Sequence, residues 1–163
     1  LVTGARVTAR FLPAAPDAGV TFRRTDLPGA PEVPARAWNV TSTARRTTLG
    51  PPEAGVTLVE HVLAALAGLR IDNCVVELDS AEPPGLDGSA KGFVDALVAA
   101  GARPLVARRP IYALPPGTKP ALVRAPGATL ALHPPAGGGT ELLASYRLDY
   151  GQLSPIAPQT LTL

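Results

Sequence analysis

The clearest alternation of apolar and polar positions lies in residues 57–73, TLVEHVLAALAGLRIDN. Four of its apolar residues follow the spacing i, i+3, i+4 and i+7, which places them on one face of a helix. They are Val59, Val62, Leu63 and Leu66. Thr57 followed by Glu60 has the spacing of a capping box, and Gly68 is suited to a left-handed helix end. The pattern predicts a short helix that begins next to Thr57 and ends at Gly68.

The opposite face of this predicted helix carries small residues and one titratable group, His61. The small residues are Ala64, Ala65 and Gly68. No charged residue occurs between Glu60 and Arg70. A solvated helix face normally carries charged side chains. We therefore expect this face to pack against another part of the protein or to line a cleft.

Runs of β-branched residues and period-two alternation predict strands on both sides of this helix. In the first hundred residues these are residues 7–12, 20–24, 35–40, 46–49 and 74–78. A second helix is predicted over residues 90–100, capped by Asp87 or Ser89 and ended by Gly101. After a linker, further strands are predicted at residues 110–114, 122–125, 130–133 and 142–150. This order predicts a two-layer α+β domain followed by a second, incomplete domain.

Composition limits the class of protein. The 163 residues are 46% hydrophobic, which is enough to build a core. The net charge of +2 and the isolated pairs of basic residues argue against a nucleic-acid-binding protein. The single cysteine, Cys74, excludes an internal disulfide, and its apolar surroundings predict a buried, unreactive thiol. No apolar run reaches the length of a transmembrane helix.

Glu60 and His61 are the candidate site residues. Imidazole is a preferred zinc ligand, and an adjacent carboxylate can remove a proton from a water on such a metal. Each residue also has an ordinary structural interpretation, because a lone helical histidine is often structural and Glu60 fits the capping box. The other histidine, His133, is interpreted as a strand-edge residue. The Arg23-Arg24 pair is interpreted as a solvated strand end.

Three segments resemble motifs of one enzyme family in order and spacing. They are residues 19–29 (GVTFRRTDLPG), 57–73 and 82–97 (EPPGLDGSAKGFVDAL). They resemble the UDP-3-O-acyl-N-acetylglucosamine deacetylase family. The resemblance implies two α+β domains of the ribosomal protein S5 domain 2-like kind, facing each other with zinc between them. Residues 1–103 would be domain I without its first strand, and residues 104–163 the linker and first strands of a truncated domain II.

The resemblance also implies an activity and site residues. The family hydrolyses the N-acetyl group of UDP-3-O-acyl-N-acetylglucosamine with Zn²⁺ and releases acetate, the committed step of lipid A biosynthesis in the cytoplasm. Glu60 matches its general base and His61 its first zinc ligand. The family's other two zinc ligands, a His and an Asp of the second domain, have no counterpart in this chain. The isolated chain is therefore expected to be inactive, and the full-length enzyme to be a monomer.

Two other interpretations follow from the residues. The chain is alternatively a non-catalytic, stand-alone domain that keeps only the family fold. A third interpretation is a phosphate-binding α+β module. It rests on Gly88 and Ser89 at the start of the second predicted helix, where backbone N–H groups favour anions.

Overall fold

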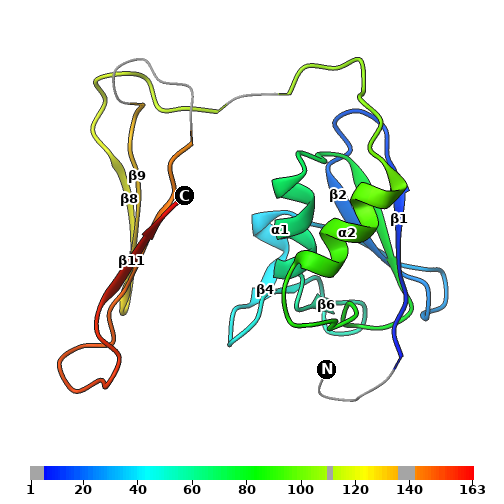
Figure 1. The fold of residues 1–163 in the computed structure, drawn as a ribbon, viewed down its shortest axis with the longest axis horizontal. Coiled ribbons are helices and arrows are strands. Elements are labelled where there is room, and N and C mark those ends of the chain that lie inside the picture. Colours follow the sequence, from blue (N-terminus) through cyan, green and yellow to red (C-terminus); the bar gives the residue numbers. More distant parts are fainter. Residues whose placement is uncertain (1–5, 110–111, 136–141) are drawn as a thin grey trace. The chain divides into compact units, whose positions relative to one another are not determined.

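The computed structural model describes residues 6–109, 112–135 and 142–163. The chain divides into two compact units, Leu1–Ala107 and Arg108–Leu163 (Figure 1). Both contain strands, and the two α-helices of the described residues belong to the first unit. This confirms the α+β class. The assignment of the units to two deacetylase domains stays a prediction.

A four-stranded mixed sheet forms the centre of the first unit. Its order is β1-β7-β2-β3. The strands are β1 (Ala9–Pro13), β2 (Val20–Arg24), β3 (Glu32–Pro34) and β7 (Cys74–Leu78). β7 is antiparallel to β1 and parallel to β2, and β3 is antiparallel to β2. The strands predicted at residues 20–24 and 74–78 are confirmed with these bounds, and the first strand lies two residues later than predicted at its start.

Two helices, α1 (Glu60–Gly68) and α2 (Lys91–Ala100), cover one face of this sheet (Figure 1). Alternate residues of β7 are buried, as expected for a strand with one face toward a core. Buried side chains of both helices and the sheet form one cluster that includes Phe22, Val62, Leu66, Val76 and Phe93. The predicted two-layer arrangement of helices on a sheet is therefore found in this unit.

A second, three-stranded sheet lies between β3 and α1 in the chain. It has the order β4-β5-β6, with β4 (Val40–Ser42), β5 (Thr48–Leu49) and β6 (Val56–Thr57) all antiparallel to their neighbours. Leu49 and Val56 are buried and belong to the core cluster described above. The small sheet is therefore anchored to the same core as the helices.

The strand predicted at residues 35–40 is wrong. A 3₁₀ helix, η1 (Ala37–Asn39), occupies half of it. The backbone N–H of Arg36 donates to the Pro34 carbonyl, and that of Asn39 donates to the Arg36 carbonyl. These local hydrogen bonds turn the chain from β3 toward β4, so Trp38 is not part of a ladder and only Val40, which pairs with Leu49, belongs to a strand.

The start of α1 differs from the capping box that the sequence predicts. The helix begins at Glu60 after Val59, and no side chain caps it. Thr57 belongs to β6, where its hydroxyl makes a hydrogen bond of 3.0 Å with the hydroxyl of Thr48. The Thr57 hydroxyl is therefore used in a cross-strand hydrogen bond and does not cap α1. The Glu60 carboxylate bonds to the backbone of Thr47 and not to that of Thr57.

The end of α1 also differs from the prediction. Gly68 is the last helical residue, and the left-handed position is taken by Arg70, with φ 56°. Its N–H donates to the Ala67 carbonyl at 3.0 Å, and the N–H of Ile71 donates to the Leu66 carbonyl at 2.8 Å, as in a Schellman motif. Ile71 packs against the core, which offsets the cost of a left-handed residue other than glycine.

The small-residue face of α1 is partly as predicted. Ala64 and Gly68 are exposed and His61 is half-buried, but Ala65 lies in the core with 1% of its surface exposed. The difference arises because Ala65 neighbours Leu66 and Val62 on the side of the helix that faces the sheet, and the buried arc is wider than a four-residue stripe.

Asp87 and Ser89, the predicted caps, form the turn before α2, whose N-cap residue is Ala90. The Asp87 carboxylate accepts hydrogen bonds from the N–H and the hydroxyl of Ser89, and the Ser89 hydroxyl accepts one from the N–H of Lys91. Gly101 follows the helix with φ 77°, as predicted for its end. Lys91 and Asp95 form an i, i+4 ion pair on the exposed side of the helix.

In the second unit, the described residues form two hairpins. One joins β8 (Ala121–Ala125) to β9 (Ala128–Leu132), and the other joins β10 (Ser145–Leu148) to β11 (Gln159–Thr162). Of the strand predicted at 110–114, the first two residues lie outside the described residues and the remaining three form no strand. β11 is an additional strand that the sequence pattern did not predict, since Pro155 and Pro158 precede it.

A pair of valine substitutions tests the position of the core. Val62 in α1 is 0% exposed, whereas Val98 in α2 is 62% exposed. We expect Val62→Ala to lower the free energy of unfolding by about 2 kcal/mol, because it removes buried methyl groups and leaves a cavity. Val98→Ala is the matched control and should change it by less than about 0.5 kcal/mol. Denaturant unfolding measures both, and equal effects would contradict the packing described.

Candidate functional site

Glu60 and His61 are the first two residues of α1 and both are half-buried. Only Leu58 and Val59 separate them from β6. Leu58 has φ 57°, a left-handed conformation that is uncommon for a branched side chain, and Val59 is completely buried. The chain thus passes from a strand to a helix in two residues, and the direction of the first helical turn follows that of β6.

The Glu60 carboxylate has a backbone hydrogen-bond donor. Its Oε2 accepts a hydrogen bond of 3.3 Å from the N–H of Thr47. Thr47 immediately precedes β5, and β5 pairs with β6 so that Thr48 lies opposite Thr57. The hairpin that leads into α1 therefore also supplies a donor to the carboxylate.

The loop after β7 lies against the same hairpin. The carbonyl of Ala81 accepts a hydrogen bond of 2.9 Å from the N–H of Thr57. Next to it, Oε1 of Glu82 is 3.2 Å from Nη1 of Arg46. Three segments that are distant in sequence are thus joined around the first turn of α1, and Thr47 and Glu60 lie within this arrangement.

Arg24 is buried, which corrects its interpretation as a solvated strand end. Only 7% of Arg24 is exposed. Its guanidinium donates to both carboxylate oxygens of Asp26, at 2.8 and 2.6 Å, and Nη1 donates to the carbonyl of Gly55 at 2.7 Å. A buried guanidinium needs such partners, because an unpaired buried charge is very costly. The bond to Gly55 links the four-stranded sheet to the start of β6.

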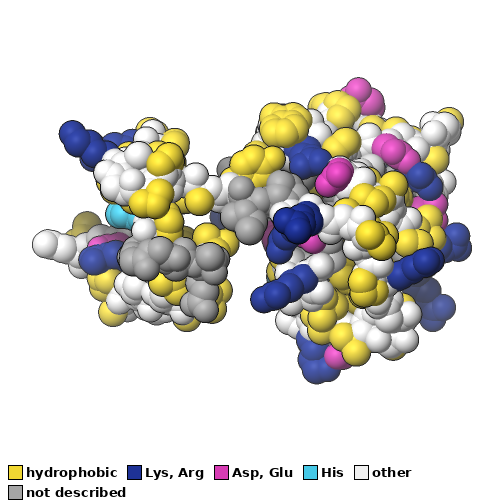
Figure 2. Space-filling view, turned by 90° about the horizontal axis from the view of Figure 1, so that it is seen from above, with side chains coloured by type: hydrophobic (Ala, Val, Ile, Leu, Met, Phe, Trp, Pro, Cys, Tyr) yellow, Lys and Arg dark blue, Asp and Glu magenta, His cyan; other side chains and the backbone are white. Residues whose placement is uncertain are grey.

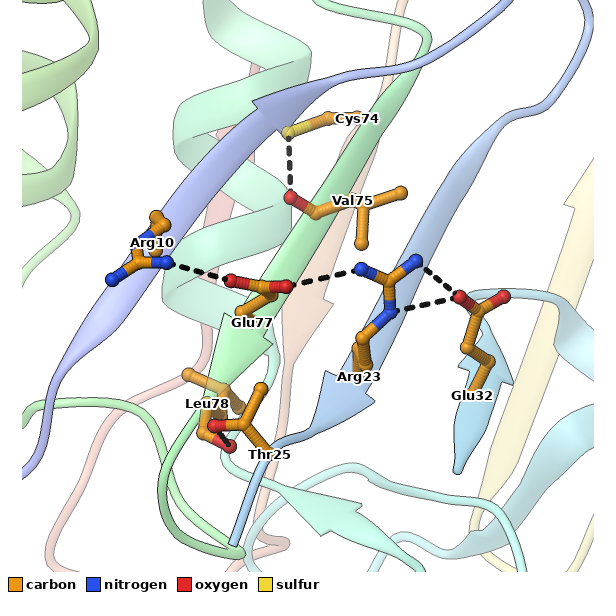
Figure 3. A network of polar contacts seen from close by, with 8 residues as sticks. All are labelled: Arg10, Arg23, Thr25, Glu32, Cys74, Val75, Glu77 and Leu78. Atoms are coloured by element: carbon orange, nitrogen blue, oxygen red, sulfur yellow. Dashed lines mark hydrogen bonds and ion pairs between the residues drawn. The ribbon is translucent and has the colours of Figure 1, made fainter. Parts of the chain in front are cut away.

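A row of alternating charges crosses the sheet on the face turned away from the helices (Figure 3). Glu77 in β7 pairs with Arg10 in β1 and Arg23 in β2, and Arg23 also pairs with Glu32 in β3. The strand register places these four residues side by side. Their positions on neighbouring strands make them a cross-strand ladder, on the other side of the sheet from α1.

The described residues do not by themselves complete a metal site. No three His, Cys, Asp or Glu side chains among them are grouped so that they could hold a metal ion. The imidazole of His61 fits the role of one zinc ligand, but it has no companions in residues 6–109, 112–135 and 142–163. His133, the other histidine, is exposed and directly follows β9.

Cys74 is buried, as the sequence predicts, with 3% of its surface exposed. Burial raises the pKa of its thiol, because an apolar environment disfavours the thiolate. Its Sγ lies 3.6 Å from the Val75 carbonyl oxygen (Figure 3). These properties describe a structural cysteine and not a nucleophile or metal ligand.

Basic and acidic side chains are mixed on the surface of the larger unit. Figure 2 shows Lys and Arg side chains spread over the visible face of this unit, with Asp and Glu between them. Several basic groups of the described residues are in ion pairs, such as Lys91 with Asp95 and Arg46 with Glu82. Among the described residues, no helix combines the length and the apolar character needed to cross a bilayer.

Comparison with known proteins identifies the family. The family model described as "LpxC: UDP-3-O-acyl N-acetylglycosamine deacetylase" matches residues 1–163. The chain belongs to the LpxC family. This confirms the resemblance carried by the three sequence motifs. The match extends through the second unit, beyond the three motifs.

Curated relatives match about three fifths of the chain. The UDP-3-O-acyl-N-acetylglucosamine deacetylases of Bdellovibrio bacteriovorus and Hahella chejuensis are 48% and 50% identical to it over 99 and 101 residues, which is 61% and 62% of this chain. A bifunctional enzyme LpxC/FabZ of Chlorobaculum tepidum is 48% identical over 101 residues, 62% of this chain and 22% of its own length. The matched part is 33% of each of the two deacetylases, so the chain covers about a third of their length.

The contacts of Thr47, Arg46 and Arg24 are features of this LpxC-family chain that the sequence pattern did not reveal. Thr47 acts through its backbone N–H, and every residue except proline carries that group. Arg24 lies beside Arg23 in a strand, and only alternation distinguishes the buried position from the exposed one. The order Arg24-Thr25-Asp26 was the available signal, since a carboxylate two residues away can pair with a buried guanidinium.

The Arg24–Asp26 pair predicts a pH dependence of stability. Its hydrogen bonds hold the pKa of the Asp26 carboxyl below its usual range. The pair therefore contributes stability above the ordinary Asp pKa of about 3.9, which is lost as the pH falls through the lower folded value. We expect Asp26→Asn to lower the free energy of unfolding at pH 7 and to flatten its decline below about pH 4. Urea unfolding at a series of pH values measures this, and parallel curves for both proteins would contradict it.

Proposed function

We propose that this chain belongs to an enzyme that hydrolyses the N-acetyl group of UDP-3-O-acyl-N-acetylglucosamine and releases acetate. The observation that carries the proposal is membership of the LpxC family, whose curated members are named for this deacetylation. Because the chain covers about a third of the length of those relatives, the activity is proposed for the full-length protein. The isolated chain is expected to be inactive.

Glu60 is proposed as the general base. A general base must hold its carboxylate in a fixed position next to the water that it deprotonates. The bond from the Thr47 N–H to Oε2 restrains one carboxylate oxygen of Glu60 and leaves Oε1 for a proton. In the proposed reaction Glu60 takes a proton from water as that water attacks the acetamide carbonyl.

His61 is proposed as one ligand of Zn²⁺. It directly follows Glu60 in the first turn of α1 and would hold the metal through an imidazole nitrogen. Zinc in such a site polarises a carbonyl oxygen and lowers the pKa of water. The described residues lack the further ligands of a zinc site, so we propose that the remainder of the full-length protein supplies them.

The finer features of the fold and setting are proposed on the same basis. The first unit is proposed to be an S5 domain 2-like deacetylase domain and the second unit the start of a similar domain. The full-length enzyme is proposed to act as a cytoplasmic monomer in lipid A biosynthesis. The alternative of a non-catalytic domain is not favoured, because the curated relatives are named as enzymes. The phosphate-binding interpretation is also not favoured, because Ser89 has a structural role: it bonds to Asp87 and to the N–H of Lys91 at the start of α2.

Substitutions in the zinc-loaded, full-length protein test the assignment. We expect Glu60→Gln to lower kcat by about 10²- to 10⁴-fold with its zinc content unchanged, because only proton transfer is lost. We expect His61→Ala to lose both zinc and turnover. Acetate release and elemental analysis measure these outcomes.

His133→Ala is the matched control, since it removes the other histidine of the chain from an exposed position. It should keep wild-type zinc content and turnover. Retention of zinc and activity in His61→Ala would show that the assignment of His61 is wrong, and full activity in Glu60→Gln would exclude Glu60 as the base.

A further inference from the structure

A closed series of contacts and chain connections, here called the ring, passes through Glu60 and its carboxylate. It contains an ion pair that the proposed chemistry does not use. Oε2 of Glu60 accepts the N–H of Thr47 at 3.3 Å. The residue before Thr47 is Arg46, whose Nη1 lies 3.2 Å from Oε1 of Glu82. The carboxylate is thus connected through one backbone hydrogen bond to an ion pair between two loops.

The ring returns to Glu60 through the backbone. Ala81, the residue before Glu82, accepts the N–H of Thr57 at 2.9 Å. Thr57 ends β6, and Glu60 follows it after two residues. Each link in the ring is therefore a chain connection of at most three residues, a hydrogen bond or the ion pair.

The ion pair holds the least supported part of this ring. Residues 43–46, which join β4 to β5, are exposed and belong to neither strand. The Arg46–Glu82 pair holds the residue before Thr47, and the pairing of Thr48 with Thr57 holds the residue after it. Without the ion pair, the N–H of Thr47 loses one of these two restraints.

We propose that Arg46 and Glu82 form a positioning pair for the Glu60 carboxylate. The proposal rests on the proposed function and adds to it two residues that set the geometry of the base without bonding to it. Arg46 acts through the backbone N–H of Thr47, and Glu82 acts by holding Arg46 against the loop that receives β6.

The exposure of the pair separates this role from a structural one. The side chains of Arg46 and Glu82 are 42% and 20% exposed. A pair this accessible to water contributes little to folding stability, whereas a small displacement of a catalytic group lowers the rate steeply. A loss of rate without a loss of stability therefore identifies positioning.

Lys91 provides a matched control. It forms an ion pair with Asp95 on α2, with side-chain exposures of 71% and 61%, and has no link to the ring. The experiment compares Arg46→Gln, which removes the charge, Arg46→Lys, which keeps it, and Lys91→Gln. All are made in the full-length, zinc-loaded protein, and kcat, KM, zinc content and Tm are measured for each.

We expect Arg46→Gln to lower kcat about tenfold while KM, zinc content and Tm stay at wild-type values. Arg46→Lys should restore most of the rate, because the ammonium group can still pair with Glu82. Lys91→Gln should match the wild type in all four measurements.

Amide hydrogen exchange gives a readout that does not need activity. In the metal-free protein we expect the N–H of Thr47 to exchange about tenfold faster in Arg46→Gln than in the wild type or in Lys91→Gln, because local opening becomes easier.

Several results would overturn the proposal. An unchanged kcat or an unchanged Thr47 exchange rate in Arg46→Gln shows that the pair does not hold the donor. Equal loss in Arg46→Lys and Arg46→Gln shows that the charge is not responsible, and a lowered Tm in Arg46→Gln alone assigns the pair to folding. Activity retained in Glu60→Gln would instead overturn the proposed function, and the exchange measurement would still decide whether Arg46 restrains Thr47.

Discussion

The burial of one face of α1 on the four-stranded sheet is the constraint from which the candidate site follows. Val62 and Leu66 of the helix lie in the same core as Phe22 and Val76 of the sheet, and all four are at most 1% exposed. Such close packing fixes the rotation of the helix about its axis, because any other rotation would expose Val62 and Leu66 and leave smaller side chains in their place. Glu60, in the first turn of this helix, has its direction set by the same contacts.

The hairpin of β5 and β6 also fixes the position of the Glu60 carboxylate, because it leads directly into α1. Only two residues separate β6 from α1, and Leu58 takes a left-handed conformation that costs about 1 kcal/mol. The complete burial of Val56 and Val59 on either side offsets this cost. Arg24 holds the start of β6 through the carbonyl of Gly55, where a side chain would approach the Pro51 carbonyl oxygen to 2.9 Å. These contacts therefore fix the position of the β5–β6 hairpin relative to α1.

The sequence by itself determined the features that depend on neighbours along the chain. β-Branched residues and the turn residues beside them gave the bounds of β2 and β7, and helical periodicity gave the apolar stripe of α1. Asp87, Ser89 and Gly101 marked the ends of α2, because capping and left-handed glycine are local preferences. The family motifs likewise lie in continuous segments, so family membership and the choice of Glu60 were accessible before the fold was known.

Only the tertiary structure decided how these segments meet. The helix begins at Glu60, later than predicted, because Thr57 is paired with Thr48 across a sheet. Arg24 can be buried because the carbonyl of Gly55, which is distant in sequence, accepts a hydrogen bond from its guanidinium. The donor to the Glu60 carboxylate is a backbone N–H, a group that almost every residue carries and that leaves no mark in a sequence. Local patterns specify which elements form, whereas contacts between distant segments specify where a carboxylate points.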